Sequence, residues 1–349
     1  MAFNVVLLPG DGIGPEVIRE ARRALERIGE VFKQHFQFTE QLIGGAALAT
    51  SRSPLPAETL HAALAADAVL LGAVGDPVFD HLPPGSRPES GLLALRKELG
   101  VFANLRPAKA WNGLEDSGPL KPTVLVGTDM IVVRELLGGL YYGEPREWNR
   151  STDQAINTLR YSRPEVERVA RVAFDLARRR KKRVVSVDKA NVLETSQLWR
   201  AVVNDVAKEF PDVQLSHEYV DACAMKLACA PASFDVLLTE NLFGEILSDE
   251  AGAICGSLGM LPSASLGAGP GLFEPVHGSA PTIAGKNVAN PCGALLSAAM
   301  MLRLGFKLDA EAAALERAVD AALRAGLRTA DLGGTTSTTA FADAVLNAI

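Results

Sequence analysis

Two carboxylates one helical turn apart are the feature of this 349-residue chain with the clearest chemical meaning. Glu245 and Asp249 follow the apolar run FDVLLTEN, which begins at Phe234, and this pattern predicts a buried strand, a short turn and a helix that carries both acids. Residues i and i+4 share a helix face, so the two negative charges repel each other unless a cation lies between them. Because open α/β sheets bind ligands beyond the carboxyl ends of their strands, the position favours a divalent cation with oxygen ligands. A solvated acidic helix face is the alternative interpretation.

Other polar residues directly follow predicted strands. Residues 130–133 lead to Arg134, with Tyr141 seven positions later, and residues 184–187 lead to Asp188 and Lys189. Asp221 likewise follows the run HEYV. Each residue could be structural, as an ion-paired arginine, a core tyrosine or a solvated lysine. Their common position at strand ends favours a shared site instead.

Three arginines add a preference for negatively charged ligands. Arg96, Arg106 and Arg134 would each present a planar, permanently charged fork that matches a carboxylate. A lysine near other cations can act as a base, and a tyrosine can deliver a proton. Together with the acidic pair, these residues predict metal-assisted chemistry on a small polycarboxylate.

The segments that must position these residues alternate between strand and helix patterns. Short β-rich runs are expected at residues 5–8 and 68–74, in addition to the strands already named, and their continuous apolar character is typical of buried parallel strands. The helix that follows Ser162 begins with a capping-box pattern, Ser162 with Glu165. Residues 256–293 are rich in glycine and proline and are predicted to form one long ligand-binding loop. These patterns indicate an α/β protein of about two domains.

Composition excludes several classes of function. A hydrophobic fraction of 48%, a charged fraction of 22% and a net charge of -6 are typical of a soluble globular protein and argue against nucleic acid as a partner. The basic run at residues 178–183 is interpreted as a set of cations that the helix dipole stabilises at the C-terminal end of a helix. The four cysteines lack metal-ligand spacing and are expected to be buried thiols in a reducing compartment. No signal peptide or membrane span is predicted, so the expected location is the cytoplasm.

Several ordered blocks carry a resemblance to a known family. LLPGDGIGPEV begins at Leu7, SGLLALRKELGVFANLRPA at Ser90, VVSVDKANVLE at Val184 and FEPVHGSAP at Phe273, and VVREL with GGLYYGEPR surrounds Arg134. These blocks closely resemble the isocitrate/isopropylmalate dehydrogenase family of β-hydroxyacid oxidative decarboxylases, and within it the isopropylmalate dehydrogenases. The similarity covers nearly the whole chain. The glycine turn GDGIG does not match the dinucleotide fingerprint GxGxxG, and the family does not use a Rossmann fold.

The resemblance implies two α/β domains that share a large mixed sheet. Residues 1–102 and 256–349 would form a cofactor-side domain, and residues 103–255 would hold the dimer interface and the metal site. The implied reaction is NAD-dependent oxidative decarboxylation of 3-isopropylmalate to 4-methyl-2-oxopentanoate, in leucine biosynthesis. The implied assembly is a homodimer whose active sites are shared between subunits.

Position by position, the resemblance also implies roles for individual residues. Arg96, Arg106 and Arg134 would bind the substrate carboxylates, and Tyr141 would protonate the enolate. Lys189 and Asp221, from the partner subunit, would handle the hydroxyl proton. Asp221, Glu245 and Asp249 would hold Mg²⁺ or Mn²⁺. The NAD-binding residues would be Glu274, His277, Gly278, Ser279, Ala280, Thr282 and Asn290.

Substrate choice would depend on an apolar surface for the group at C3. Glu89, Leu92, Leu93 and Val192 are the residues expected there, and an alkyl group suits them better than a third carboxylate would. Leu92 and Leu93 could instead belong to a helix core. Isocitrate is therefore disfavoured as the substrate.

The chain departs from the family pattern at four positions. Glu245 and Thr282 each replace an aspartate, Leu137 replaces a threonine, and Asp76 replaces a glycine. The first change leads us to expect a weaker or altered metal preference, and the second leads us to expect weakened NAD affinity without a new site for NADP. Two alternatives stay open: a dehydrogenase of another 3-substituted malate or tartrate, and a non-catalytic paralogue.

Overall fold

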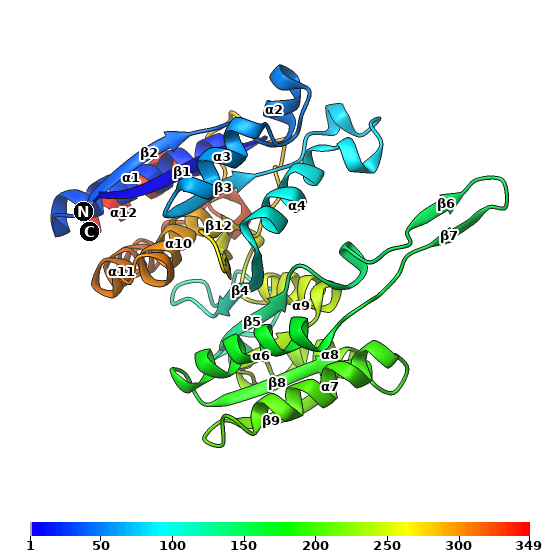
Figure 1. Ribbon diagram of the computed structural model, residues 1–349. Coiled ribbons are helices and arrows are strands. Elements are labelled where there is room, and N and C mark those ends of the chain that lie inside the picture. Colours follow the sequence, from blue (N-terminus) through cyan, green and yellow to red (C-terminus); the bar gives the residue numbers. More distant parts are fainter. Residues whose placement is uncertain (1) are drawn as a thin grey trace. The chain divides into compact units, whose positions relative to one another are not determined.

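The computed structural model describes residues 2–349, which belong to two compact units (Figure 1). Unit 1 contains the chain up to Val101, a short piece at Trp111–Pro119, and Cys255–Ile349. Unit 2 contains Phe102–Ala110 and Leu120–Ile254. Unit 1 is therefore assembled from segments that are distant in sequence, whereas unit 2 is formed mainly by one continuous stretch.

Unit 1 has five strands in the order β2-β1-β3-β12-β11. Strand β1 pairs in parallel with β2 and β3, β12 pairs in parallel with β3, and β11 pairs antiparallel with β12. The strands are β1 (Ala2–Gly10), β2 (His35–Glu40), β3 (Ala68–Ala73), β11 (Pro262–Gly267) and β12 (Gly271–Pro275). All six residues of β3 are buried, as expected for a central strand with both faces covered.

Helices cover both faces of the unit 1 strands. Helices α1 and α10 pack against the strands and against each other, and α11 and α12 pack against them from outside. Helices α2 and α4 contact β1 and β12, and α3 packs on α4. The helices are α1 (Gly14–Phe32), α2 (Gly44–Ser51), α3 (Ala57–Ala65), α4 (Pro88–Leu99), α10 (Cys292–Met300), α11 (Asp309–Arg324) and α12 (Thr338–Ala348).

Unit 2 has five strands in the order β4-β5-β10-β8-β9, of which only the β4–β5 pair is antiparallel. Helices α6 and α7 pack together on these strands, as do α8 and α9. The strands are β4 (Val101–Lys109), β5 (Asp129–Glu135), β8 (Arg183–Asp188), β9 (Gln214–Tyr219) and β10 (Val236–Thr239). The helices are α5 (Pro122–Leu125), α6 (Arg163–Arg178), α7 (Glu194–Ala207), α8 (Val220–Cys229) and α9 (Asn241–Ile254).

A two-stranded hairpin extends from unit 2 (Figure 1). It consists of β6 (Glu147–Asn149) and β7 (Gln154–Ile156), which pair antiparallel only with each other. All six of these residues are exposed, including the large side chains of Trp148 and Ile156. A lone hairpin of this kind has no core of its own to stabilise it.

The structure confirms the α/β class and most of the predicted elements. The strand, glycine turn and helix at the N-terminus are β1 and α1, and the capping box of α6 forms, with the Ser162 amide donating to Glu165 at 2.6 Å. The prediction of one long loop over residues 256–293 is wrong, because β11 and β12 lie within it. The small residues of PSASLG carry little strand signal, and pairing with neighbouring strands determines their conformation.

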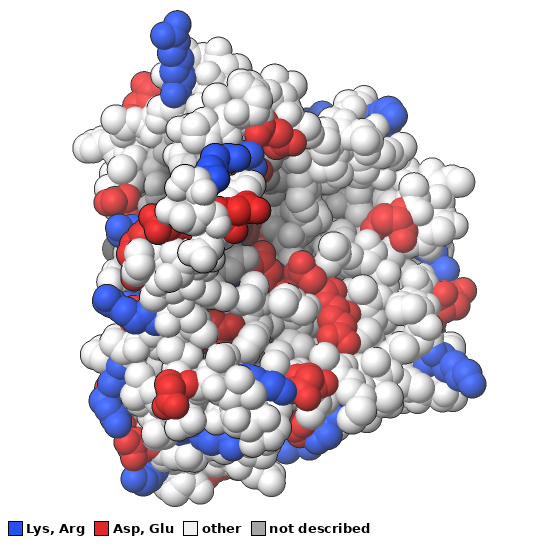
Figure 2. All heavy atoms as spheres, turned by 90° about the vertical axis from the view of Figure 1, so that its right-hand side faces the viewer, with Lys and Arg blue, Asp and Glu red and all other residues white. Residues whose placement is uncertain are grey.

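Charged side chains of both signs lie on the surface (Figure 2). Acidic and basic side chains are interspersed over the face shown in Figure 2. In the basic run, Arg178 lies in the last turn of α6 and pairs with Asp212 at 2.7 Å, and Arg180 pairs with Asp235 at 2.8 Å, so both side chains have partners within the chain. All four cysteines are free; Cys223, Cys255 and Cys292 are buried as predicted, but Cys229 is exposed, so the prediction of a buried thiol is wrong there. Within residues 2–349, no helix combines the length and the apolar character that crossing a membrane would require.

Candidate active site

Arg134 is the most deeply buried charged residue of the unit 2 site. It lies near the carboxyl end of β5 and is 1% exposed. Its Nε donates to the carbonyl oxygen of Asn241 at 2.8 Å, and its Nη2 donates to Asn241 Oδ1 at 2.7 Å and to Glu245 Oε2 at 2.9 Å. Gly244 is required beside it, because a Cβ there would collide with the Arg134 side chain and with Thr239. The guanidinium is therefore fixed in direction before any ligand binds.

Arg106 lies on the neighbouring strand, on the same face. In the antiparallel β4–β5 pair, Arg106 is opposite Val132 and Asn104 is opposite Arg134, so the two arginines are diagonal neighbours. Arg106 Nη1 donates to Ser248 Oγ at 2.8 Å and to Asp249 Oδ1 at 3.0 Å, and its Nε donates to Asn104 at 2.7 Å. Two forks on one sheet face can bind two carboxylates of a small molecule.

The acidic pair on α9 faces these arginines. Glu245 pairs with Arg134 and Asp249 pairs with Arg106, and the Tyr141 hydroxyl donates to the same Glu245 oxygen that Arg134 contacts. Burial raises the pKa of Asp249, and repulsion from Glu245 adds to the shift while Arg106 opposes it. The structure thus brings together Arg106, Arg134, Tyr141, Glu245 and Asp249.

The acidic pair has the chemistry of a divalent-cation site. The hydrogen bonds from residues within 2–349 use Oε2 of Glu245 and Oδ1 of Asp249, so the other oxygen of each carboxylate is available to a cation. A bound cation would also relieve the repulsion that raises the pKa of Asp249. However, the described residues of this single chain hold no cluster of three or more potential ligands. Two ligands alone make an incomplete site for Mg²⁺ or Mn²⁺.

Lys189 and Asp221 form a separate pair. Lys189 follows β8, Asp221 lies in the first turn of α8, and the Lys189 ammonium donates to the Asp221 carboxylate. This hydrogen bond lowers the pKa of Asp221. The Asp221 side chain is 67% exposed, and Val192, just beyond Lys189, is 66% exposed. Among residues 2–349, Asp221 does not form a three-ligand cluster with Glu245 and Asp249.

In unit 1, Arg96 pairs with a predicted cofactor residue. Its Nη2 donates to Glu274 Oε1 at 2.8 Å, and both side chains are nearly buried. Glu89, Leu92 and Leu93 precede Arg96 at helical spacing on α4. Leu92 and Leu93 are only half-buried, so the alternative that they belong to a closed helix core is not what the structure shows.

The predicted dinucleotide loop follows β12. His277 Nδ1 contacts the Gly278 carbonyl oxygen at 3.0 Å, while its buried Nε2 has no hydrogen-bond partner among residues 2–349. Burial lowers the pKa of His277. An orphaned imidazole nitrogen beside exposed loop backbone fits a site for a polar ligand. Asn290 differs, because its amide is engaged with Asp331 at 3.0 Å and with the Cys292 amide at 3.0 Å.

The four departures from the family pattern occupy distinct environments. Thr282 is exposed in the dinucleotide loop, and Leu137 is half-buried after β5. Asp76 accepts from the Val78 amide at 3.0 Å and so caps a short 3₁₀ turn. Of the four, Glu245 contacts the predicted substrate-binding residue Arg134 and the predicted catalytic residue Tyr141.

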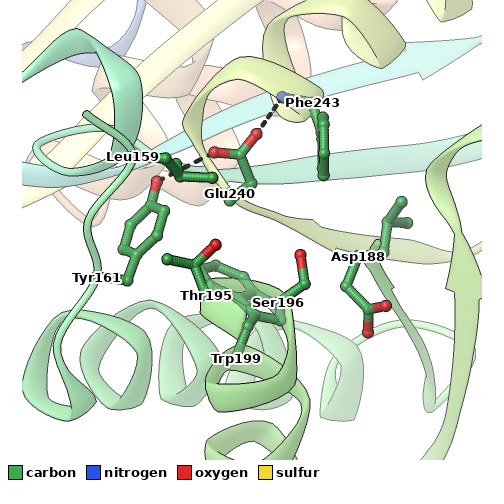
Figure 3. Close-up of a pocket in the computed structure, with 9 residues that line it drawn as sticks. Leu159, Tyr161, Asp188, Thr195, Ser196, Trp199, Glu240 and Phe243 are labelled. Carbon is green, nitrogen blue, oxygen red and sulfur yellow. Dashed lines mark hydrogen bonds between the residues drawn. The ribbon is translucent and has the colours of Figure 1, made fainter. Parts of the chain in front are cut away.

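A small cavity lies elsewhere in unit 2 (Figure 3). Its volume of about 10 Å³ is enough for roughly one water molecule, which excludes it as the substrate site. Tyr161 and Glu240 line it, and the Tyr161 hydroxyl accepts a hydrogen bond from the Asn241 amide at 2.9 Å. The cavity therefore lies behind the residue that orients Arg134.

Sequence reasoning missed three residues that support this site. Asn104, Asn241 and Ser248 each hold one of the arginines. Asn241 could have been noticed, because it is the first residue of α9, directly after the short connection that follows the buried strand β10. Asn104 and Ser248 carry no such local signal.

Comparison with known proteins completes the description. Residues 4–345 match the family model described as isocitrate/isopropylmalate dehydrogenase. The chain belongs to the isocitrate/isopropylmalate dehydrogenase family. It is 57% identical over 333 residues to 3-isopropylmalate dehydrogenase of Geobacillus kaustophilus (95% of this chain, 90% of that one). It is 53% identical over 332 residues to that of Aquifex aeolicus (95% and 91%).

Solved structures of the isocitrate/isopropylmalate dehydrogenase family show the same fold. The crystal structure of isocitrate dehydrogenase from Methylococcus capsulatus superposes with a TM-score of 0.88 at 35% identity, and covers 99% of each chain. The predicted fold class is therefore confirmed.

Proposed function

We propose that this protein catalyses the NAD-dependent oxidative decarboxylation of 3-isopropylmalate, a step of leucine biosynthesis. The observation that carries the proposal is the match, over 95% of the chain, to 3-isopropylmalate dehydrogenases at 53% and 57% identity. The arrangement of two arginines, a tyrosine and two carboxylates in unit 2 supports it. The two units would be the two domains, with unit 1 on the cofactor side.

The residues have distinct roles in this reaction. Arg106 and Arg134, joined by Arg96, would bind the two malate carboxylates and fix the C2 hydroxyl in position. Lys189, held by Asp221, would accept the hydroxyl proton. After the 3-carboxylate leaves as CO₂, the Tyr141 hydroxyl would donate a proton to carbon C3 of the enolate.

Two bound groups would complete the chemistry. NAD would accept the hydride from C2, and a divalent cation would polarise the hydroxyl oxygen and stabilise negative charge on it. Glu245 and Asp249 would hold the cation together with Asp221 of a second subunit. The loop Gly278–Asn290, with Glu274 and His277, would bind NAD.

Because the proposed cation ligands come from two subunits, the proposed active site requires a homodimer. Unit 2 carries large apolar side chains on its surface that a partner could cover: Met225 on α8 is 61% exposed and Ile246 on α9 is 55% exposed. Trp148 on the projecting hairpin is 59% exposed. In the proposed dimer, the second copy would have to place its Lys189 and Asp221 near the acidic pair.

Isocitrate is the second candidate substrate, because the Methylococcus capsulatus structure is that of an isocitrate dehydrogenase. Its third carboxylate would have to lie against the apolar side chains of Leu92 and Leu93, which cannot compensate the desolvation of a charge. The isopropyl group of 3-isopropylmalate is apolar and suits this surface.

A substrate panel tests the proposal. Isopropylmalate, isocitrate, malate and tartrate are each assayed with NAD and with NADP at saturating Mg²⁺ and Mn²⁺. We expect kcat/KM for isopropylmalate with NAD to exceed every other combination by about 100-fold. A higher value with isocitrate or tartrate would reassign the substrate. No turnover with any of the four would favour a non-catalytic paralogue.

A further inference from the structure

The opening motif GDGIGPE takes no part in the proposed chemistry, although it touches the predicted dinucleotide loop at several points. Gly12 approaches Ser279 so closely that a Cβ at Gly12 would collide with the Ser279 carbonyl oxygen, and its φ of +58° favours glycine. The Ile13 amide donates to the same carbonyl oxygen at 2.8 Å. The first residues of the loop are thus fixed against the turn that precedes α1.

Glu16 makes the second connection. It lies in the first turn of α1 and is buried, with 8% of its surface exposed. One oxygen of its carboxylate accepts from the Gly285 amide, and the other accepts from the Asn287 amide at 3.1 Å. Hydrogen bonds from backbone amides to a buried carboxylate are among the stronger ones in proteins. A single side chain therefore fixes the far side of the loop.

The third connection comes from α12. The Thr338 amide donates to the Asn287 carbonyl oxygen at 3.0 Å, and the Thr339 hydroxyl donates to Asn287 Oδ1 at 2.9 Å. The Thr338 hydroxyl donates to the Ala289 carbonyl oxygen at 2.6 Å. Between these connections lie residues 280–284, of which Pro281 and Thr282 are exposed. The base of the loop is held by α1 and α12, and its tip is presented outward.

We propose that Glu16 is a positioning residue for the dinucleotide: it preorganises the loop at residues 278–290 through the Gly285 and Asn287 amides. The inference rests on the proposed function in taking this loop as the NAD site. A loop that is already ordered loses less conformational entropy when a ligand binds. Without the Glu16 carboxylate, the loop would become ordered only when the dinucleotide binds, and the entropy lost in that step would lower the affinity for the dinucleotide.

The test compares Glu16→Gln with Glu16→Asp in the full-length protein. Glutamine keeps the length but turns an amide N–H toward one of the two backbone donors, and aspartate keeps the charge but shortens the reach. Glu20→Gln is the matched control, because Glu20 is a fully buried acid one turn further along α1 that pairs with Arg19 and Arg23 instead of the loop.

The measurements separate cofactor positioning from general stability. For Glu16→Gln we expect the KM for NAD and the Kd for NADH, from fluorescence titration without substrate, to rise about tenfold. The KM for isopropylmalate and kcat should change less than twofold. Hydrogen exchange at the Gly285 and Asn287 amides should accelerate about tenfold, because those amides lose their acceptor. The values for Glu16→Asp should lie between those of wild type and those of Glu16→Gln. Glu20→Gln should resemble wild type in every measurement except thermal stability.

Several outcomes would overturn the inference. An unchanged Kd for NADH with Glu16→Gln, or equal rises in the KM of NAD and isopropylmalate, would mean that Glu16 serves the fold alone. Failure of wild type to bind NADH would overturn it as well. Failure of the proposed substrate is distinguishable, because wild type would then bind NADH without oxidising isopropylmalate, and the titration and exchange measurements would still decide the role of Glu16.

Discussion

Glu245, the proposed metal ligand on α9, is one methylene longer than the aspartate of the family pattern. Its carboxylate reaches both the Tyr141 hydroxyl and the Arg134 guanidinium, so one of its oxygens already has two donors. Mg²⁺ tolerates little error in its octahedral distances. We therefore attribute any weakened metal affinity of this protein to competition for that carboxylate.

Shortening the side chain tests this interpretation. We expect Glu245→Asp to lower the Mg²⁺ concentration for half-maximal activity about threefold to tenfold, because the shorter carboxylate matches the geometry of the family. Activity is titrated with Mg²⁺ and Mn²⁺ under saturating substrate and NAD. Glu250→Asp, on the same helix, is the control. An unchanged Mg²⁺ requirement would show that the extra methylene does not limit binding.

Thr282 is the departure from the family pattern that we expect to affect the choice between NAD and NADP. Its side chain is exposed at the tip of the dinucleotide loop, and an aspartate there would accept hydrogen bonds from the adenosine ribose and repel a 2′-phosphate. Thr282→Asp is expected to raise the ratio of kcat/KM with NAD to kcat/KM with NADP by about tenfold. Thr282→Asn, which lacks the charge, should change the ratio less. A ratio that stays constant in both variants would contradict this assignment.

At the scale of elements, the strand-to-helix connection from β10 to α9 holds two layers of polar groups. Asn241 orients Arg134 on one side, and Tyr161 with Glu240 forms the second layer behind it. Burial raises the pKa of Glu240, against the opposing influence of the Phe243 amide and Arg134, and burial also raises the pKa of the neighbouring Glu135. The contribution of this connection to the stability of the fold therefore depends on pH.

The sign of this dependence follows from linkage. Because the folded-state pKa of Glu240 is raised, its contribution to stability is fully present below the unfolded-state pKa and is lost as pH rises through the folded-state value. Glu240→Gln stays neutral, so we expect its Tm to exceed that of wild type by a difference that grows from pH 4 to pH 8, reaching about 2–4 °C. Circular dichroism measures both transitions. With the exposed control Glu194→Gln the difference should be constant, and a constant difference for Glu240→Gln would contradict the prediction.

The elements also show how much of the fold could be predicted from the sequence alone. Apolar runs and capping residues predicted β1, β5, β8 and α6, because those signals are local. The acceptor role of Glu16 was not predictable, since its partners lie about 270 positions later and are backbone amides, which leave no trace in residue type. Strand β11 was not predictable for a similar reason, because its small residues carry little strand signal and its conformation depends on pairing with neighbouring strands.

At the scale of the whole molecule, the proposed homodimer with shared active sites makes a prediction about mixtures of subunits. Lys189→Met and Asp249→Asn should each inactivate the homodimer. When the two variants are co-expressed and half of the dimers are mixed, each mixed dimer contains one intact site, so about a quarter of wild-type activity should return. Co-expressing Lys189→Met with Asp221→Asn is the control, because both changes affect the donating side and no intact site forms. Equal activity in the two mixtures would mean that each site is built within one chain.

The interleaved composition of unit 1 has a consequence for protein synthesis. Strand β3 pairs with β12, and α1 packs on α10, so the first 101 residues leave the ribosome without the partners that cover them. Roughly 170 residues separate Val101 from β12, which corresponds to about 10–30 s of translation. During that interval the nascent chain exposes an unpaired strand edge and the apolar face of α1, while the continuous stretch of unit 2 can already fold. Chaperone binding to the nascent chain should therefore concentrate on its first hundred residues.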